Sequence, residues 1–174
     1  MSNLIVLFGK IGAGKNFVGN ILAEYFDFYF WDADEALTSE MLECIKLKQP
    51  FTPQMRNQLV NLMIEHISLL KSKYANIVVA QALYKEANRQ SLRLSFPEAH
   101  FICIEANLEN RGQRLAKLKS EINNEYARII DLNYEQPTSK CDIVANNEDS
   151  EFIIKQLKDL LKLEVCFKTA IKMK

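Results

Sequence analysis

The fold is decided by Leu4–Asn16, which reads Leu-Ile-Val-Leu-Phe-Gly-Lys-Ile-Gly-Ala-Gly-Lys-Asn. Leu4–Phe8 is a continuous apolar run that ends at a glycine, a pattern typical of a strand buried on both faces. A helix is expected at 15–26, because apolar residues recur there at helical spacing. Only five glycines occur in 174 residues, and three of them lie between Gly9 and Gly14. Glycine is thus concentrated where the main chain must bend sharply or approach a ligand closely.

The glycine segment matches the phosphate-binding pattern GxxxxGK[ST] except at its last position, where Asn16 replaces serine or threonine. In such a loop the main-chain N–H groups cradle phosphate oxygens, and the following helix adds the positive end of its dipole. Lys15 is expected to place its charge on the β- and γ-phosphates of ATP. The alternatives are a chance glycine loop, or a site that binds nucleotide but turns it over poorly. The predicted ATP-binding residues are Gly9, Lys10, Ile11, Gly12, Ala13, Gly14, Lys15 and Asn16.

Two carboxylates follow the second strand candidate, the aromatic run Phe28–Trp31. In parallel α/β sheets, ligands bind beyond the carboxyl ends of the strands, so Asp32 and Asp34 should share an edge with the glycine loop. We expect Asp32, together with the amide oxygen of Asn16, to hold Mg²⁺ directly or through water, or to accept a hydroxyl proton. Asp34 is expected to bind the substrate, with a helix N-cap as the alternative.

Two basic features are candidates for the same cleft. Arg56, one turn into a helix that starts at Thr52-Pro53, either holds an anionic substrate group or is an exposed helical arginine. The helix expected at 108–120 is strongly basic and is predicted to cover the triphosphate as a lid, the alternative being a solvated basic face. Its cations are Arg111, Arg114, Lys117 and Lys119, of which Arg114 is the predicted catalytic residue alongside Lys15 and Asp32.

The remaining pattern alternates strands and helices, which predicts an α/β fold with one doubly wound five-stranded parallel sheet and helices on both faces. A single domain spans 1–174, with the lid at roughly 112–128 and a basic tail at 166–174. The expected strands are 4–8, 28–31, 77–80, 101–104 and 141–144, and the expected helices after the first are 35–47, 53–74, 85–95, 108–120, 121–132 and 150–163.

Composition limits the partners. Lysine plus arginine and aspartate plus glutamate both total 22, so no net charge attracts nucleic acid or acidic membranes. Four scattered cysteines without a CxxC motif fit reduced thiols in a cytoplasm. No apolar run approaches the roughly 20 residues of a membrane span, and the first residues lack a signal-peptide pattern. We therefore expect a cytoplasmic enzyme for a small molecule, monomeric or homodimeric, with neither nucleic acid nor membrane as partner.

With these motifs in place, the chain resembles the small P-loop kinases of the gluconate kinase and shikimate kinase group over nearly its whole length. The resemblance begins with the glycine loop, Val6–Lys15, and continues with Asp32-Ala33-Asp34, where those kinases carry Asp-Gly-Asp. Two further segments match: Pro50–Arg56 resembles their Pro-Leu-Thr-Asp-x-x-Arg, and Val79–Lys85 resembles their Ala-Cys-Ser-Ala-Leu-Lys. Near the lid, Arg114-Leu115 matches their Arg-Leu, and Glu135-Gln136-Pro137 matches their Leu-Glu-x-Pro. Asn16 departs from the pattern, the Gly-His-Phe-Met lid stretch is absent, and Lys117 or Lys119 would replace the second lid arginine.

The resemblance implies ATP- and Mg²⁺-dependent phosphorylation of a hydroxyl on a small polar or anionic metabolite, similar to gluconate or shikimate. It implies nucleotide contacts in the glycine loop, a metal or base role near Asp32, and substrate contacts from Asp34 and Arg56. One alternative acceptor is a nucleoside or nucleoside monophosphate, with Phe51 or Tyr84 stacking on the base. Another alternative is a nucleotide-binding protein whose catalysis is weakened.

Overall fold

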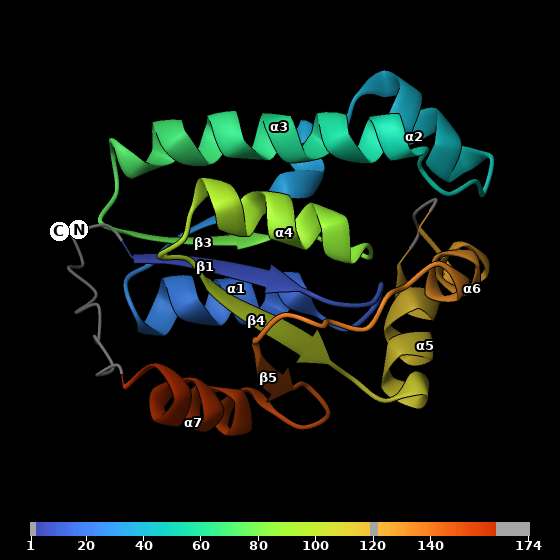
Figure 1. Ribbon diagram of the computed structural model, residues 1–174. Coiled ribbons are helices and arrows are strands. Elements are labelled where there is room, and N and C mark those ends of the chain that lie inside the picture. Colours follow the sequence, from blue (N-terminus) through green and yellow to red (C-terminus); the bar gives the residue numbers. More distant parts are fainter. Residues whose placement is uncertain (1–2, 119–121, 163–174) are drawn as a thin grey trace, which may run out of the picture.

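The computed structural model describes residues 3–118 and 122–162, and in this part of the chain five parallel strands form one sheet in the order β2-β3-β1-β4-β5 (Figure 1). This arrangement confirms the expected α/β class with helices on both faces of a parallel sheet. The strands are β1 (Asn3–Phe8), β2 (Tyr29–Asp32), β3 (Asn76–Ala80), β4 (His100–Glu105) and β5 (Asp142–Ala145).

The helices lie close to the predicted segments, with one exception. They are α1 (Lys15–Tyr25), the 3₁₀ turn η1 (Ala33–Ala36), α2 (Ser39–Lys46), α3 (Pro53–Lys71), α4 (Glu86–Ser95), α5 (Leu108–Lys117), α6 (Asn124–Leu132) and α7 (Ser150–Leu161). The prediction of one helix over 35–47 was wrong. The Asp32 side chain accepts a hydrogen bond from the N–H of Asp34, which closes η1, and Thr38 then caps a separate helix, α2. Lys119 and the basic tail 166–174 lie outside the described residues.

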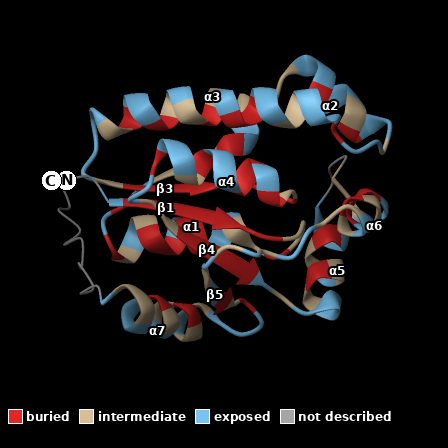
Figure 2. Ribbon diagram, viewed as in Figure 1, coloured by how far each residue is buried: buried red, intermediate tan, exposed pale blue. Residues whose placement is uncertain are grey.

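Side chains of β1 alternate between two apolar cores. Leu4, Val6 and Phe8 pack in the core beneath α3 and α4, whereas Ile5 and Leu7 pack in the core beneath α1 and α7. Figure 1 shows these helix pairs on opposite sides of the sheet, and Figure 2 shows that the central strands β1, β3 and β4 between them are mostly buried. Burial on both faces explains why β1 is a continuous apolar run rather than an alternating one.

The strand register brings the chemically interesting residues to one edge of the sheet. Leu7 of β1 and Asp32 of β2 both pair with Ala80 of β3, and Phe8 pairs with Cys103 of β4. The glycine loop after β1, Asp32 at the end of β2 and Gln81 after β3 therefore meet at the carboxyl ends of neighbouring strands, where parallel sheets bind ligands.

Candidate active site

The glycine loop has a backbone that other residues would not adopt. Gly9 has φ 141° and Gly14 has φ 89°, both in the region that favours glycine. A Cβ atom at Gly9 would collide with the main-chain carbonyl of Ile104, and one at Gly14 would collide with the Asn146 side chain. Gly14 also precedes α1, so the loop leads directly into a helix N-terminus. This geometry is a cradle suited to phosphate groups.

Three side chains from distant segments hold this loop in shape. Arg111 Nε donates to the carbonyl of Ile11 at 2.8 Å, and Arg114 Nη1 donates to the carbonyl of Ala13 at 3.1 Å. Asn146, only 1% exposed, donates from Nδ2 to the same Ala13 carbonyl at 2.8 Å. The turn at 146–149 showed no functional signal in the sequence beyond its place after a strand, and the role of Asn146 follows only from the fold.

Lys15 lies inside the loop. Its Nζ donates to the carbonyls of Gly9 and Lys10, both at 3.2 Å. Desolvation lowers the pKa of Lys15, and the carboxylates of Asp34 and Asp32 counteract part of this effect. A poorly hydrated ammonium attracts phosphate more strongly than one in bulk water.

Asn16 and Asp32 lie in direct contact. Asn16 Nδ2 donates to Asp32 Oδ2 at 2.5 Å, while Asp32 Oδ1 accepts from the N–H of Asp34 at 3.0 Å. The described residues contain no group of three or more histidines, cysteines or carboxylates placed to hold a metal ion. One carboxylate beside a phosphate loop nevertheless fits Mg²⁺, which commonly takes one or two carboxylates and completes its shell with phosphate oxygens and water.

Asp34 faces the cavity in front of the loop and is held by Gln81, whose Nε2 donates to Asp34 Oδ1 at 2.8 Å. The Asp34 side chain is exposed to solvent through the open cavity, but protein atoms surround it on several sides. Desolvation raises the pKa of Asp34, the neighbouring Asp32 raises it further, and Gln81 and Lys15 counteract both. Gln81 was not predicted, because its role depends on the proximity of η1 to the end of β3.

The cavity has a volume of about 350 Å³, within the range of roughly 300–1,000 Å³ for small-molecule sites. It joins Lys15 and Asn16 of the loop to Asp34 and Arg114. Arg56 does not line it. The Arg56 guanidinium donates to the carbonyl of Phe51, lies 5.6 Å from the centre of the Tyr84 ring, and borders a smaller adjoining space.

The cations expected on the lid divide into two kinds. Arg111 is buried and pairs with Asp131 at 2.8 Å, so its charge is neutralised inside the fold. Arg114 faces the cavity, and its Nη2 donates to the Asn146 carbonyl at 2.7 Å. Lys117 is exposed at the end of α5. The structure thus brings Arg114, but not Arg111, to the open side of the loop.

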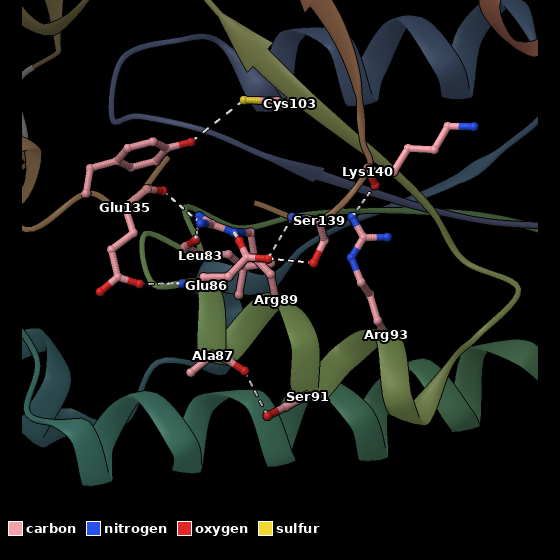
Figure 3. Close-up of polar contacts among 11 residues, drawn as sticks. Leu83, Glu86, Ala87, Arg89, Ser91, Arg93, Cys103, Glu135, Ser139 and Lys140 are labelled. Carbon is pink, nitrogen blue, oxygen red and sulfur yellow. Dashed lines mark hydrogen bonds and ion pairs between the residues drawn. The ribbon is translucent and has the colours of Figure 1, made fainter. Parts of the chain in front are cut away.

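A buried arginine fixes the loop that carries Gln81 and Tyr84. Arg89 of α4 is 1% exposed, and it donates to the carbonyls of Leu83 and Glu135, both at 2.7 Å (Figure 3). It also pairs with Glu86 at 2.6 Å. Leu83 has φ 44°, an uncommon conformation for a non-glycine residue, and the bond from Arg89 helps to hold it.

Fold and loop together define the class of structure: the chain has the fold of the small P-loop kinases. A sugar kinase from Janibacter sp. HTCC2649 superposes with a TM-score of 0.80 at 16% identity, over 94% of this chain and 96% of that one. A gluconokinase from Sinorhizobium meliloti 1021 superposes with a TM-score of 0.75 at 20% sequence identity, over 88% of each chain. A deoxyadenosine kinase from M. mycoides with bound dATP superposes with a TM-score of 0.62 at 16% sequence identity, over 91% of this chain and 98% of that one.

These likenesses confirm the expected resemblance at the level of the fold. The sequence matches no protein-family model and no curated protein sequence. In the described part of the chain, no helix is both long and apolar enough to cross a membrane.

Proposed function

We propose that the protein is an ATP-dependent kinase that transfers a phosphoryl group to a hydroxyl of a small molecule. One observation carries the proposal: the cavity that contains Lys15 and the glycine loop also contains Asp34, a carboxylate able to orient an acceptor hydroxyl. Phosphoryl transfer needs mainly positioning and charge stabilisation from the protein, and this cavity offers a place for both reactants. The fold shared with sugar, gluconate and deoxyadenosine kinases supports the same reaction class.

The roles follow from position. The loop Gly9–Asn16 and the N-terminus of α1 would hold the phosphates of ATP, with Lys15 and Arg114 as the cations nearest the reacting group. Asp32 and Asn16 would hold Mg²⁺, which would neutralise part of the charge on the transferred phosphoryl group. Asp34 would accept a hydrogen bond from the acceptor hydroxyl, and its raised pKa suits a group that takes up a proton.

One candidate acceptor is a polar or anionic metabolite similar to gluconate or shikimate, and this alternative depends on Arg56. Arg56 would need to leave the Phe51 carbonyl to reach an anion in the cavity. We also propose a cytoplasmic monomer or homodimer with no nucleic-acid partner, in keeping with the free thiols of Cys44, Cys103 and Cys141.

Replacement of Lys15 tests the proposal. Lys15→Ala should lower kcat/KM for ATP by at least a hundredfold, equivalent to about 2.7 kcal/mol of transition-state stabilisation. The measurement is ADP release in the presence of an acceptor panel, together with calorimetric binding of a non-hydrolysable ATP analogue. Lys46→Ala, at an exposed position of α2, serves as the matched control. Unchanged ATP turnover in Lys15→Ala would overturn the assignment.

A second candidate is a nucleotide-binding protein with weakened catalysis. The Asn16–Asp32 hydrogen bond favours it, because it engages an oxygen of the carboxylate expected to hold Mg²⁺. Affinity for ATP without product from any acceptor would support this candidate.

A further inference from the structure

The cavity has two ends with different chemistry. The end at the glycine loop carries Lys15 and Arg114, which suit phosphate. The other end, where an acceptor would lie, is walled mostly by apolar and aromatic side chains. Among these are Leu37, Ile45, Phe51, Tyr84, Ile122 and Tyr126. Among the described residues that line the cavity, Asp34 is the only carboxylate, and Lys15 and Arg114 are the only cations.

Arg56 borders the smaller space beside the cavity, and its guanidinium is engaged by other protein groups. Its Nη1 donates to the carbonyl of Phe51, and its guanidinium lies over the Tyr84 ring, with 5.6 Å between Cζ and the ring centre. Phe51 and Tyr84 are both buried wall residues. Arg56 therefore supports the aromatic wall from behind, and its charge is already partly balanced by a carbonyl dipole and an aromatic face.

The polar groups at this end are few. Gln81 donates from Nε2 to Asp34 at 2.8 Å and accepts at Oε1 from the N–H of Ala82 at 2.6 Å, so both ends of its amide are engaged. Asp34 is left as the carboxylate acceptor for a substrate, and the buried Tyr84 hydroxyl, which has no hydrogen-bond partner among the described residues, is a second polar group in the cavity wall. The arrangement thus suits one hydroxyl, or a pair of adjacent hydroxyls, rather than a chain of them.

A sugar acid would fit this end poorly. Its carboxylate would lie against Asp34 and apolar walls, and most of its hydroxyls would lose water without gaining partners. A flat aromatic ring gains from the same walls, since aromatic pairs favour stacked or edge-to-face packing. We propose that the acceptor is an uncharged hydroxyl compound built on an aromatic ring, the class to which nucleosides belong, with its hydroxyl at Asp34 and its ring between Phe51, Tyr84 and Tyr126. This inference depends on the proposed kinase function.

An acceptor panel with the full chain tests the inference. Adenosine, uridine and pyridoxine represent uncharged aromatic alcohols with and without ribose, whereas gluconate, shikimate and AMP represent charged acceptors. Turnover is measured by ADP release, and the product is confirmed by mass spectrometry. We expect kcat/KM for the best aromatic alcohol to exceed that for every charged acceptor by at least tenfold. Comparison of the nucleosides with pyridoxine shows whether ribose is required.

A charge placed in the wall should reverse this selectivity. Leu118 lines the cavity yet is 55% exposed, so Leu118→Arg can be introduced with little disturbance of the core. The ratio of kcat/KM for the aromatic alcohol to that for gluconate should fall at least tenfold in Leu118→Arg. Leu94→Arg, at an 83% exposed position of α4 away from the cavity, should leave the ratio unchanged.

The possible failures are distinguishable when binding of a non-hydrolysable ATP analogue is measured alongside. If gluconate, shikimate or AMP gives the highest kcat/KM, the proposed class of uncharged aromatic acceptors is wrong, while the kinase function remains supported. Analogue binding with no aromatic alcohol bound or phosphorylated would likewise overturn that acceptor class. Absence of analogue binding would remove the proposed function, and this inference with it.

Discussion

The side chains of Asn16 and Asp32 are joined by a hydrogen bond of 2.5 Å, from Nδ2 of the first to Oδ2 of the second. The bond links the first turn of α1 to the end of β2. A neutral amide thus stands where the phosphate-loop pattern has a hydroxyl, and the bond engages the carboxylate expected to hold Mg²⁺.

Restoring the hydroxyl should therefore improve the site. In Asn16→Ser the shorter side chain frees Asp32 Oδ2, and we expect the Mg²⁺ concentration for half-maximal activity to fall severalfold and kcat to rise. Steady-state ADP release across a magnesium titration measures both. Asn20→Ser, on the exposed surface of the same helix, controls for a general effect of the exchange. A drop in kcat for Asn16→Ser would show that the amide itself is required.

Asp34 should impose a pH dependence on the reaction. Because desolvation by the surrounding protein and the charge of Asp32 raise the pKa of Asp34, its carboxylate gains a proton at a higher pH than an ordinary aspartate with pKa 3.8. If the ionised form accepts the hydroxyl proton, kcat/KM should fall with decreasing pH at a point above that ordinary value. Asp34→Asn should lower kcat by about 10²–10⁴ and abolish this acidic limb. Glu35→Gln, at the exposed neighbouring position, should keep the limb.

The ion pair between Arg89 and Glu86 should govern stability rather than catalysis. Removal of one partner from a buried pair costs about 3–5 kcal/mol, so Arg89→Met should lower the free energy of unfolding by that order. Urea denaturation followed by circular dichroism measures the loss, with Gln90→Met on the exposed side of α4 as control. A change below 1 kcal/mol would contradict the role given to Arg89.

The same pair predicts acid sensitivity. Desolvation opposes ionisation of Glu86, but hydrogen bonds from Ser139 and Arg89 outweigh it and lower the pKa to about 2 from an ordinary 4.5. A carboxylate with a lowered folded-state pKa stabilises the fold above its unfolded-state pKa, and this contribution is lost as the pH falls from about 4.5 towards 2. The stability difference between the natural chain and Glu86→Gln should shrink across that interval.

The sequence was sufficient for features that depend on neighbouring residues. The apolar run of β1, the glycine loop and the helix that follows are adjacent in the chain, and strand alternation with helices predicted the parallel sheet. The break between η1 and α2 was missed because it depends on capping by Asp32 and Thr38, whose side chains accept main-chain hydrogen bonds in preference to continuing one helix.

The unpredicted parts of the candidate site come from contacts between distant segments. Gln81 donates a hydrogen bond to Asp34, which lies 47 positions away in the sequence, and Asn146 donates one to Ala13, which lies 133 positions away. Arg56 was considered only as a substrate contact or an exposed residue, yet it lies against Phe51 and Tyr84, because the choice among partners is made by packing. Hydrophobic periodicity carries no information about such pairings.

The bonds of Arg114 to Ala13 and Asn146 have a consequence for how the reaction would begin. The guanidinium is already oriented beside the glycine loop by protein groups alone, at 3.1 Å and 2.7 Å from the two carbonyl oxygens. A dipolar environment that is set during folding need not be rebuilt in each turnover, which is the condition for preorganised electrostatic catalysis. Arriving nucleotide would therefore meet a fixed positive charge rather than recruit one from solvent.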